Sequence, residues 1–197
     1  QSGLVMKIGV LALQGDFSAH QKCLEHQNVP VLQVRESKDL DAIEGLVLPG
    51  GESSVMSRLL LRYGLFEPLQ KKIQQGLPIF ATCAGLILLS QKCHPAIPKL
   101  LAVLPIEVER NAYGAQIESS VCHLPFPEIA PDLLEVYFIR APVITRWESD
   151  LKILGFWKNH PIVLKYRNIL AMTCHPELQT QTPFYPYWLK NVVTTPV

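Results

Sequence analysis

The chain contains a short apolar run that ends at a cysteine between small residues, Pro78-Ile79-Phe80-Ala81-Thr82-Cys83-Ala84-Gly85. The next residues, Leu86-Ile87-Leu88-Leu89-Ser90, are typical of a helix. A strand that turns sharply into a helix at a nucleophile is the elbow geometry of many hydrolases. Small side chains leave room for that turn, and the peptide dipoles at a helix start favour a thiolate. The run therefore predicts a strand–turn–helix unit with a reactive Cys83 at the turn.

The first half of the chain repeats this alternation of strand and helix. Apolar strands are predicted at residues 7–13, 29–34, 45–49 and 77–82, with helices at 17–27 and 55–75. Gly64 and Pro68 are expected to break the second helix in two. Apolar strands that alternate with helices indicate a mostly parallel sheet covered on both faces.

The second half changes character. Short strands are predicted at 104–108, 116–124, 134–139, 152–157, 161–166 and 169–172, with a closing helix at 183–193. They suggest antiparallel additions beside the parallel sheet. No internal repeat or linker is visible, so we expect an α/β protein with a single domain from 6 to 197. Met6 is the expected native start, with residues 1–5 an expression remnant or a disordered N-terminus.

Composition excludes several classes of function. The 197 residues are 48% hydrophobic, and 18 basic and 17 acidic residues give a net charge of +1. No basic footprint for nucleic acid or an anionic membrane exists, and no apolar run approaches the ~20 residues of a membrane span. No signal peptide is recognisable. Five cysteines at irregular spacing indicate free thiols in a reducing compartment, which we expect to be the cytoplasm.

Two other segments fit a thiol-dependent reaction. His175 follows a predicted strand, and on an extended chain Glu177 would point to the same side, so the carboxylate could orient the imidazole. Gly50 and Gly51 follow another buried strand and would let backbone N–H groups approach an oxyanion. The adjacent Glu52-Ser53-Ser54 could equally cap the following helix, and both interpretations can hold together. No Gly-Lys-Ser/Thr follows the glycines, which excludes a P-loop.

Several motifs in order along the chain resemble one family, the glutaminase subunits of pyridoxal 5'-phosphate synthase (PdxT or SNO type), within the class I glutamine amidotransferases. Cys-Ala-Gly with His-Pro-Glu indicates the broader class. The more specific motifs are Leu13-Gln14-Gly15-Asp16-Phe17, Arg110-Asn111-Ala112-Tyr113-Gly114 and Phe138-Ile139-Arg140-Ala141-Pro142. The resemblance covers nearly the whole chain from Met6. It implies the three-layer, flavodoxin-like fold of that class.

The resemblance also implies an activity, the hydrolysis of L-glutamine to glutamate and ammonia without a cofactor. Cys83 would attack the amide, His175 would shuttle protons and Glu177 would orient His175. The implied oxyanion groups are Gly50, Gly51 and Ala84; the implied glutamine-binding residues are Gly51, Glu52, Ser53, Arg110, Ile139 and Arg140. Ammonia would pass to a separate (βα)8-barrel synthase subunit, which the turn at Gln14 and Gly15 is expected to meet. Ala115 departs from the family's usual arginine, and Ser54 from its usual threonine.

Less specific interpretations compete with this one. Without the resemblance, a buried cysteine is more often a small core residue than a nucleophile. Three Cys-His dipeptides, at 93–94, 122–123 and 174–175, offer poor zinc-ligand spacing, so no metal is expected. His20, His26 and His160 are expected to be surface or packing residues. The alternative functions are another class I amidotransferase with a different acceptor, and a cysteine-elbow redox sensor.

Overall fold

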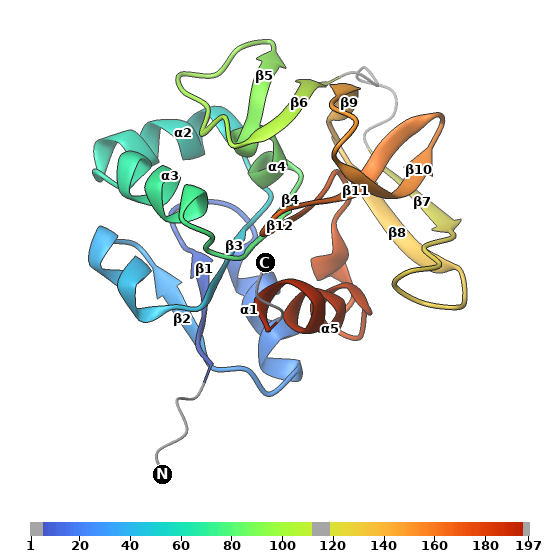
Figure 1. Cartoon of the computed structure of the whole chain (residues 1–197), viewed down its shortest axis with the longest axis horizontal. Coiled ribbons are helices and arrows are strands. Elements are labelled where there is room, and N and C mark those ends of the chain that lie inside the picture. The colour runs from blue at the N-terminus through green and yellow to red at the C-terminus, as the bar shows by residue number, and fades with distance from the viewer. Residues whose placement is uncertain (1–5, 112–118, 195–197) are drawn as a thin grey trace.

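The computed structural model describes residues 6–111 and 119–194 (Figure 1). Residues 1–5, Ala115 and the start of the predicted strand 116–124 lie outside the described part of the chain. The prediction that residues 6–197 form one domain therefore stays a prediction.

A seven-stranded sheet forms the centre, in the order β10-β11-β12-β4-β3-β1-β2. Five neighbouring strands are parallel: β1 Ile8–Leu11, β2 Val31–Val34, β3 Gly45–Leu48, β4 Ile79–Thr82 and β12 Ile169–Met172. Two antiparallel strands extend the sheet beyond β12: β11 His160–Tyr166 and β10 Lys152–Trp157. The predicted α/β class, with a mostly parallel sheet and antiparallel additions, is confirmed.

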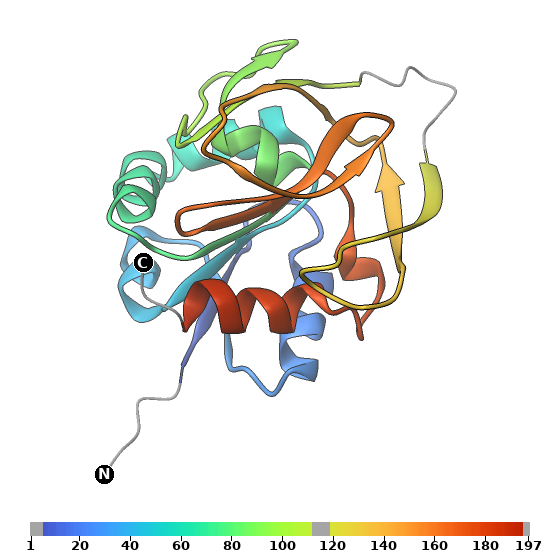
Figure 2. The same cartoon turned by 45° about the vertical axis from the view of Figure 1, so that its right-hand side comes forward.

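Helices cover both faces of this sheet (Figure 2). One face carries α2 Ser53–Arg62, α3 Phe66–Gln74 and α4 Ala84–Leu89. The other carries α1 Phe17–His26 and α5 Phe184–Trp188, which continues as a π-helical segment, η3 Leu189–Val193. Two 3-10 segments, η1 Ser37–Ala42 and η2 Pro176–Leu178, complete the helical elements of the described residues.

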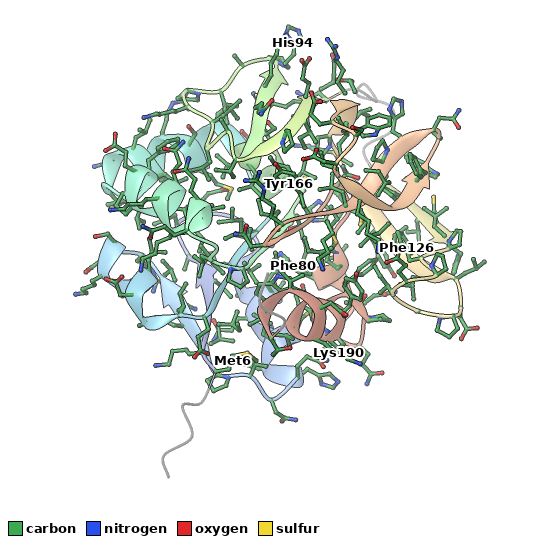
Figure 3. The ribbon with its side chains drawn as sticks, in the orientation of Figure 1. Met6, Phe80, His94, Phe126, Tyr166 and Lys190 are labelled. Atoms are coloured by element: carbon green, nitrogen blue, oxygen red, sulfur yellow. The ribbon has the colours of Figure 1, made fainter. Side chains whose placement is uncertain are left out.

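The alternation of side chains along β3 explains the two layers. Leu46 and Leu48 are fully buried in the core beneath α2, α3 and α4, whereas Val47 is buried in the core beneath α1 and α5. Successive side chains on a strand point to opposite faces, so a continuous apolar strand supplies both cores at once. Phe80 lies next to α5 (Figure 3). There it stacks on Tyr185 with ring centroids 4.8 Å apart.

The structure corrects the predicted helix break and adds two strands. The helix predicted at 55–75 divides at Gly64, but Pro68 lies within α3, in the first turn, where a missing N–H costs no intrahelical hydrogen bond. The strands not predicted are β5 Ser90–His94 and β9 Val143–Trp147, which form a small sheet with β6 Leu104–Glu109. A hairpin of β7 Ser119–Leu124 and β8 Leu134–Ile139 lies beside it.

Among the described residues, no helix combines the length and apolar character that a membrane span requires.

Candidate active site

The candidate site lies at the carboxyl ends of four neighbouring parallel strands, β12, β4, β3 and β1. His175 follows β12, Cys83 follows β4, Gly50 follows β3 and the turn at Gln14 follows β1. Parallel strands end at the same edge of a sheet, so residues far apart in the sequence meet there. This edge is where open α/β sheets hold their ligands.

Cys83 occupies a strained elbow between β4 and α4. Its backbone has φ 48° and ψ −105°, a conformation that non-glycine residues rarely adopt outside functional sites. Ala84 is the first residue of α4, so its N–H has no acceptor within the helix. A Cβ at Gly85 would overlap the carbonyl of Leu48, which explains why the turn needs glycine there. The elbow thus presents the Cys83 thiol next to the N–H of Ala84, which has no hydrogen-bond partner among the described residues.

His175 lies between the thiol of Cys83 and the carboxylate of Glu177. Nδ1 of His175 is 2.5 Å from Oε1 of Glu177, and the Cys83 side chain lies close enough to the imidazole to influence its pKa. Nε2 is 3.3 Å from the carbonyl oxygen of Ile139, and the backbone N–H of His175 donates to Tyr137 at 2.8 Å. The ring is therefore fixed from both sides.

The backbone between His175 and Glu177 is not extended, as we predicted, but turns. Glu177 lies in the 3-10 turn η2, whose first residue is Pro176. The turn, rather than strand alternation, folds the carboxylate back onto the imidazole. The contact that we expected is present, but its local cause was wrongly predicted.

The ionisation of this pair follows from its hydrogen bonds. Burial opposes a charged imidazole, but hydrogen bonds and charges from Cys83 and Glu177 outweigh it and raise the pKa of His175 to about 11. Burial alone would raise the pKa of the Glu177 carboxyl, yet the hydrogen bond with His175 and the nearby histidines hold it below its usual value. His175 therefore carries a proton at neutral pH and Glu177 carries a negative charge.

The loop after β3 is tied to the turn after β1. The Oε1 atom of Gln14 accepts a hydrogen bond from the N–H of Glu52 at 2.9 Å. Gly15 has φ +90°, and a Cβ there would overlap the carbonyl of Gly50. Gly50 itself contacts the site, because a Cβ on it would lie 2.8 Å from Cε1 of His175 and 3.5 Å from Cβ of Cys83. The glycines allow the loop and the turn to approach each other and the thiol.

A cavity of about 280 Å³ opens above the thiol. It is lined by nine of the predicted residues, Gln14, Gly51, Glu52, Ser53, Cys83, Arg110, Ile139, Arg140 and His175. Four predicted residues do not line the cavity but adjoin residues that do: Gly15, Gly50, Ala84 and Glu177. The cavity combines carboxylate and guanidinium groups with backbone donors, which suits a small zwitterion.

Sequence reasoning missed several neighbours of this cavity. The cavity is also lined by Asp16, Ile87 and Asn111. Each lies next to a predicted residue or one helical turn from one, and this proximity in sequence could have identified them. Ligand atoms of Asp16, His175 and Glu177 lie within 4.8 Å of one another. His175 and Glu177 already bond each other, so we assign no metal to this group. His20, predicted as a surface or packing residue, is fully buried beside Glu177.

The chain matches a known protein family over nearly all of its length. The sequence pattern of the SNO glutamine amidotransferase family matches residues 10–194. The chain belongs to the SNO glutamine amidotransferase family. Its membership establishes it as a glutamine amidotransferase and confirms the family resemblance seen in the motifs.

Two relatives match the chain over nearly all of its length. "Pyridoxal 5'-phosphate synthase subunit PdxT" of Thermotoga petrophila is 43% identical over 187 residues, which covers 95% of this chain and 100% of the relative. The protein of the same name from Desulforamulus reducens is 39% identical with the same coverage.

Solved structures agree with the family assignment. A crystal structure of a glutamine amidotransferase superposes with a TM-score of 0.87 at 34% identity and covers 93% of this chain and 97% of its own. The structure of PurLQS from Thermotoga maritima has a TM-score of 0.61 at 16% identity, covering 88% of this chain and 89% of the other, and shares the fold alone.

Proposed function

We propose that this chain hydrolyses the side-chain amide of L-glutamine with Cys83, His175 and Glu177, and delivers the ammonia to a pyridoxal 5'-phosphate synthase partner. The convergence of these three side chains at one cavity in a glutamine amidotransferase carries the proposal. The relatives at about 40% identity, named as subunits of that synthase, support the destination of the ammonia.

The reaction would proceed in two steps through a thioester. The imidazolium of His175 stabilises a Cys83 thiolate, which attacks the amide carbon of glutamine. His175 then gives its proton to the leaving nitrogen, so that ammonia departs and a thioester remains. In the second step His175 takes a proton from water, the resulting hydroxide attacks the thioester, and glutamate leaves as the thiol is restored.

Backbone donors would stabilise the tetrahedral oxyanion of each step. Ala84 offers the unpaired N–H at the start of α4, and the Gly50–Gly51 loop offers N–H groups on the opposite side. Glu177 keeps the imidazole in the orientation that both proton transfers need. The negative charge of Glu177 also balances the positive charge of His175 whenever the imidazole is protonated.

Charged groups at the cavity would hold the amino-acid end of glutamine. Arg110 and Arg140 are suited to its α-carboxylate, and Glu52 to its α-ammonium. Gly51, Ser53 and Ile139 complete this part of the wall. Arg110 is already fixed at one end, because its Nη1 donates to the carbonyl of Pro95 at 3.1 Å.

The partner would be a (βα)8-barrel synthase subunit that meets the turn at Gln14 and Gly15. The hydrogen bonds between this turn and the Gly50–Gly51 loop support that placement, since a partner pressing on the turn would also set the oxyanion loop. The reaction needs a reduced thiol, and all five cysteines are free, so we place the enzyme in the cytoplasm.

Ammonia release from glutamine, measured with and without a candidate synthase, tests the proposal. We expect release to rise with the synthase present, and pyridoxal phosphate to form when sugar phosphates are supplied. Ammonium salt should replace glutamine in that mixture. Reversible oxidation of Cys83 with glutamine left intact, even beside the partner, would instead favour a redox sensor. Ammonia release without pyridoxal phosphate would point to a different acceptor.

A further inference from the structure

A fully buried histidine lies directly behind the candidate site. His20 is on the inner face of α1 and has no exposed surface. Its Nδ1 is 2.7 Å from the hydroxyl of Tyr185, and its Nε2 is 3.2 Å from Oγ1 of Thr82, the residue before Cys83. A buried polar ring is costly unless its hydrogen bonds are made, so these contacts define its orientation.

The second oxygen of Glu177 faces this histidine. Oε1 of Glu177 binds His175, but none of the described residues hydrogen-bonds Oε2, which is fully buried. Nε2 of His20 lies 3.7 Å from Oε2. A buried carboxylate oxygen without a donor is destabilised, and an N–H dipole directed at it relieves part of that cost.

The hydrogen bond with Tyr185 decides which nitrogen of His20 carries the proton. Burial raises the pKa of the Tyr185 phenol well above its usual value, so the hydroxyl keeps its proton and can donate to Nδ1. Burial also lowers the pKa of His20 to about 4, so the ring is neutral and holds one proton. The opposite tautomer would turn the lone pair of Nε2 toward a carboxylate. Electrostatics therefore favours the proton on Nε2.

We propose that His20 is a positioning residue: its Nε2 is held by Thr82, and this keeps the Nε2–H of a neutral imidazole 3.7 Å from Oε2 of Glu177, so that Oε1 stays on His175. This inference rests on the proposed function, because it assigns His20 to the reaction of Cys83. His20 does not line the cavity and touches no substrate; it acts through the carboxylate. Tyr185 in turn holds His20 in the required tautomer.

Several ionisable groups surround the carboxylate of Glu177. His175 lies on its own segment, and His20 comes from α1, whose Cys23 thiol contacts the backbone carbonyl of Glu177 at 3.7 Å. Tyr185 comes from α5, and Asp16 from the turn after β1. Burial raises the pKa of the Cys23 thiol, so it stays protonated, and Glu177 is therefore flanked by one charged and one neutral histidine.

Steady-state kinetics of the complex with a synthase partner tests this role. We expect His20→Leu to lower kcat about tenfold with an unchanged KM for glutamine, because the carboxylate loses the N–H dipole beside Oε2 and the support that keeps Oε1 on His175. The acid limb of its pH profile should move to higher pH, because Glu177 loses a favourable dipole. His20→Gln, which restores an N–H donor, should recover most of kcat. His26→Leu, at the exposed end of the same helix, is the control and should leave both constants unchanged.

A second measurement does not depend on activity or on a variant that folds. In the wild-type protein labelled with 15N-histidine, NMR should show His20 as the neutral Nε2–H tautomer at pH 7, and Tyr185→Phe should mix the two tautomers. A proton on Nδ1 overturns the inference, as does a folded His20→Leu with wild-type kcat or with a changed KM alone. A wild-type complex that releases no ammonia refutes the proposed function instead, and the tautomer still decides the geometry of His20.

Discussion

The backbone N–H of Asp16 donates a hydrogen bond of 3.1 Å to the carbonyl oxygen of Gly50. This bond joins the turn after β1 to the loop after β3, and the hydrogen bond from Glu52 to Gln14 joins the same two segments again. A displacement of the turn must therefore displace the proposed oxyanion loop. The relationship gives a structural route by which a bound partner would control hydrolysis.

Gln14→Ala removes one of these two links and should loosen the loop. We expect kcat for ammonia release in the complex to fall about tenfold, since a single loop hydrogen bond contributes on the order of 1 kcal/mol. Gln33→Ala, which loses a partly buried side-chain hydrogen bond with Gln21, is the matched control. Equal activities of the two variants would argue against coupling between turn and loop.

Cys83→Ala removes the proposed nucleophile and should lower glutamine hydrolysis by more than about a thousandfold, because no other group can form the thioester. Binding to the synthase should be unaffected. Cys93→Ala is a suitable control. Both cysteines are 7% exposed, but Cys93 lies on β5 and does not line the cavity. Ammonia release by the Cys83 variant at the control's rate would discard the nucleophile assignment.

Gly50→Ala would place a methyl group 2.8 Å from Cε1 of His175. The ring must then turn away from the thiol, so we expect kcat to drop at least about tenfold with little change in thermal stability. Gly64→Ala gives the opposite pattern. Its Cβ meets nothing within 4 Å, but φ +66° strains an alanine, so stability should fall by about 1 kcal/mol while hydrolysis is retained.

Arg140→Ala tests the proposed binding of the α-carboxylate. The lost charge-assisted hydrogen bonds should raise KM for glutamine about tenfold and change kcat much less. Arg146→Ala removes an arginine whose side chain is 78% exposed, outside the cavity, and serves as the control. An unchanged KM in Arg140→Ala would count against its role.

The shifted pKa values of the two buried histidines, His20 and His175, make the free energy of unfolding depend on pH. An exposed histidine titrates near ~6.5, whereas the pKa of His20 in the folded chain is about 4. Between these values the unfolded chain binds more protons, so the free energy of unfolding should fall by roughly 3 kcal/mol as pH drops from about 6.5 to 4.

His175 acts with the opposite sign, because its raised pKa makes the folded chain the better proton binder between about 6.5 and 11. Stability from this group is complete below pH ~6.5 and is lost as pH rises. Urea unfolding at several pH values measures both limbs. His20→Gln should flatten the acid limb and His26→Gln should not; identical acid limbs in the wild type and His20→Gln would contradict the assignment.

The parallel sheet and the residues that meet at its edge could be predicted from local sequence patterns. Continuous apolar strands such as 45–48 and 79–82 can be buried only on both faces, which requires helices on each side. The small residues around Cys83 and the glycines at 50 and 51 each restrict the local backbone to a sharp turn. These signals are local, so they could be interpreted without knowing what packs against them.

The remaining groups of the site are brought together by packing between distant segments. His20 belongs to a helix whose sequence resembles any other amphipathic helix, yet the packing of α1 on the sheet places its ring behind Glu177. The turn η2, and not an extended strand, brings Glu177 to His175. Distances of a few ångströms between segments 165 residues apart, such as His20 and Tyr185, depend on strand order and layer packing, which local patterns do not encode.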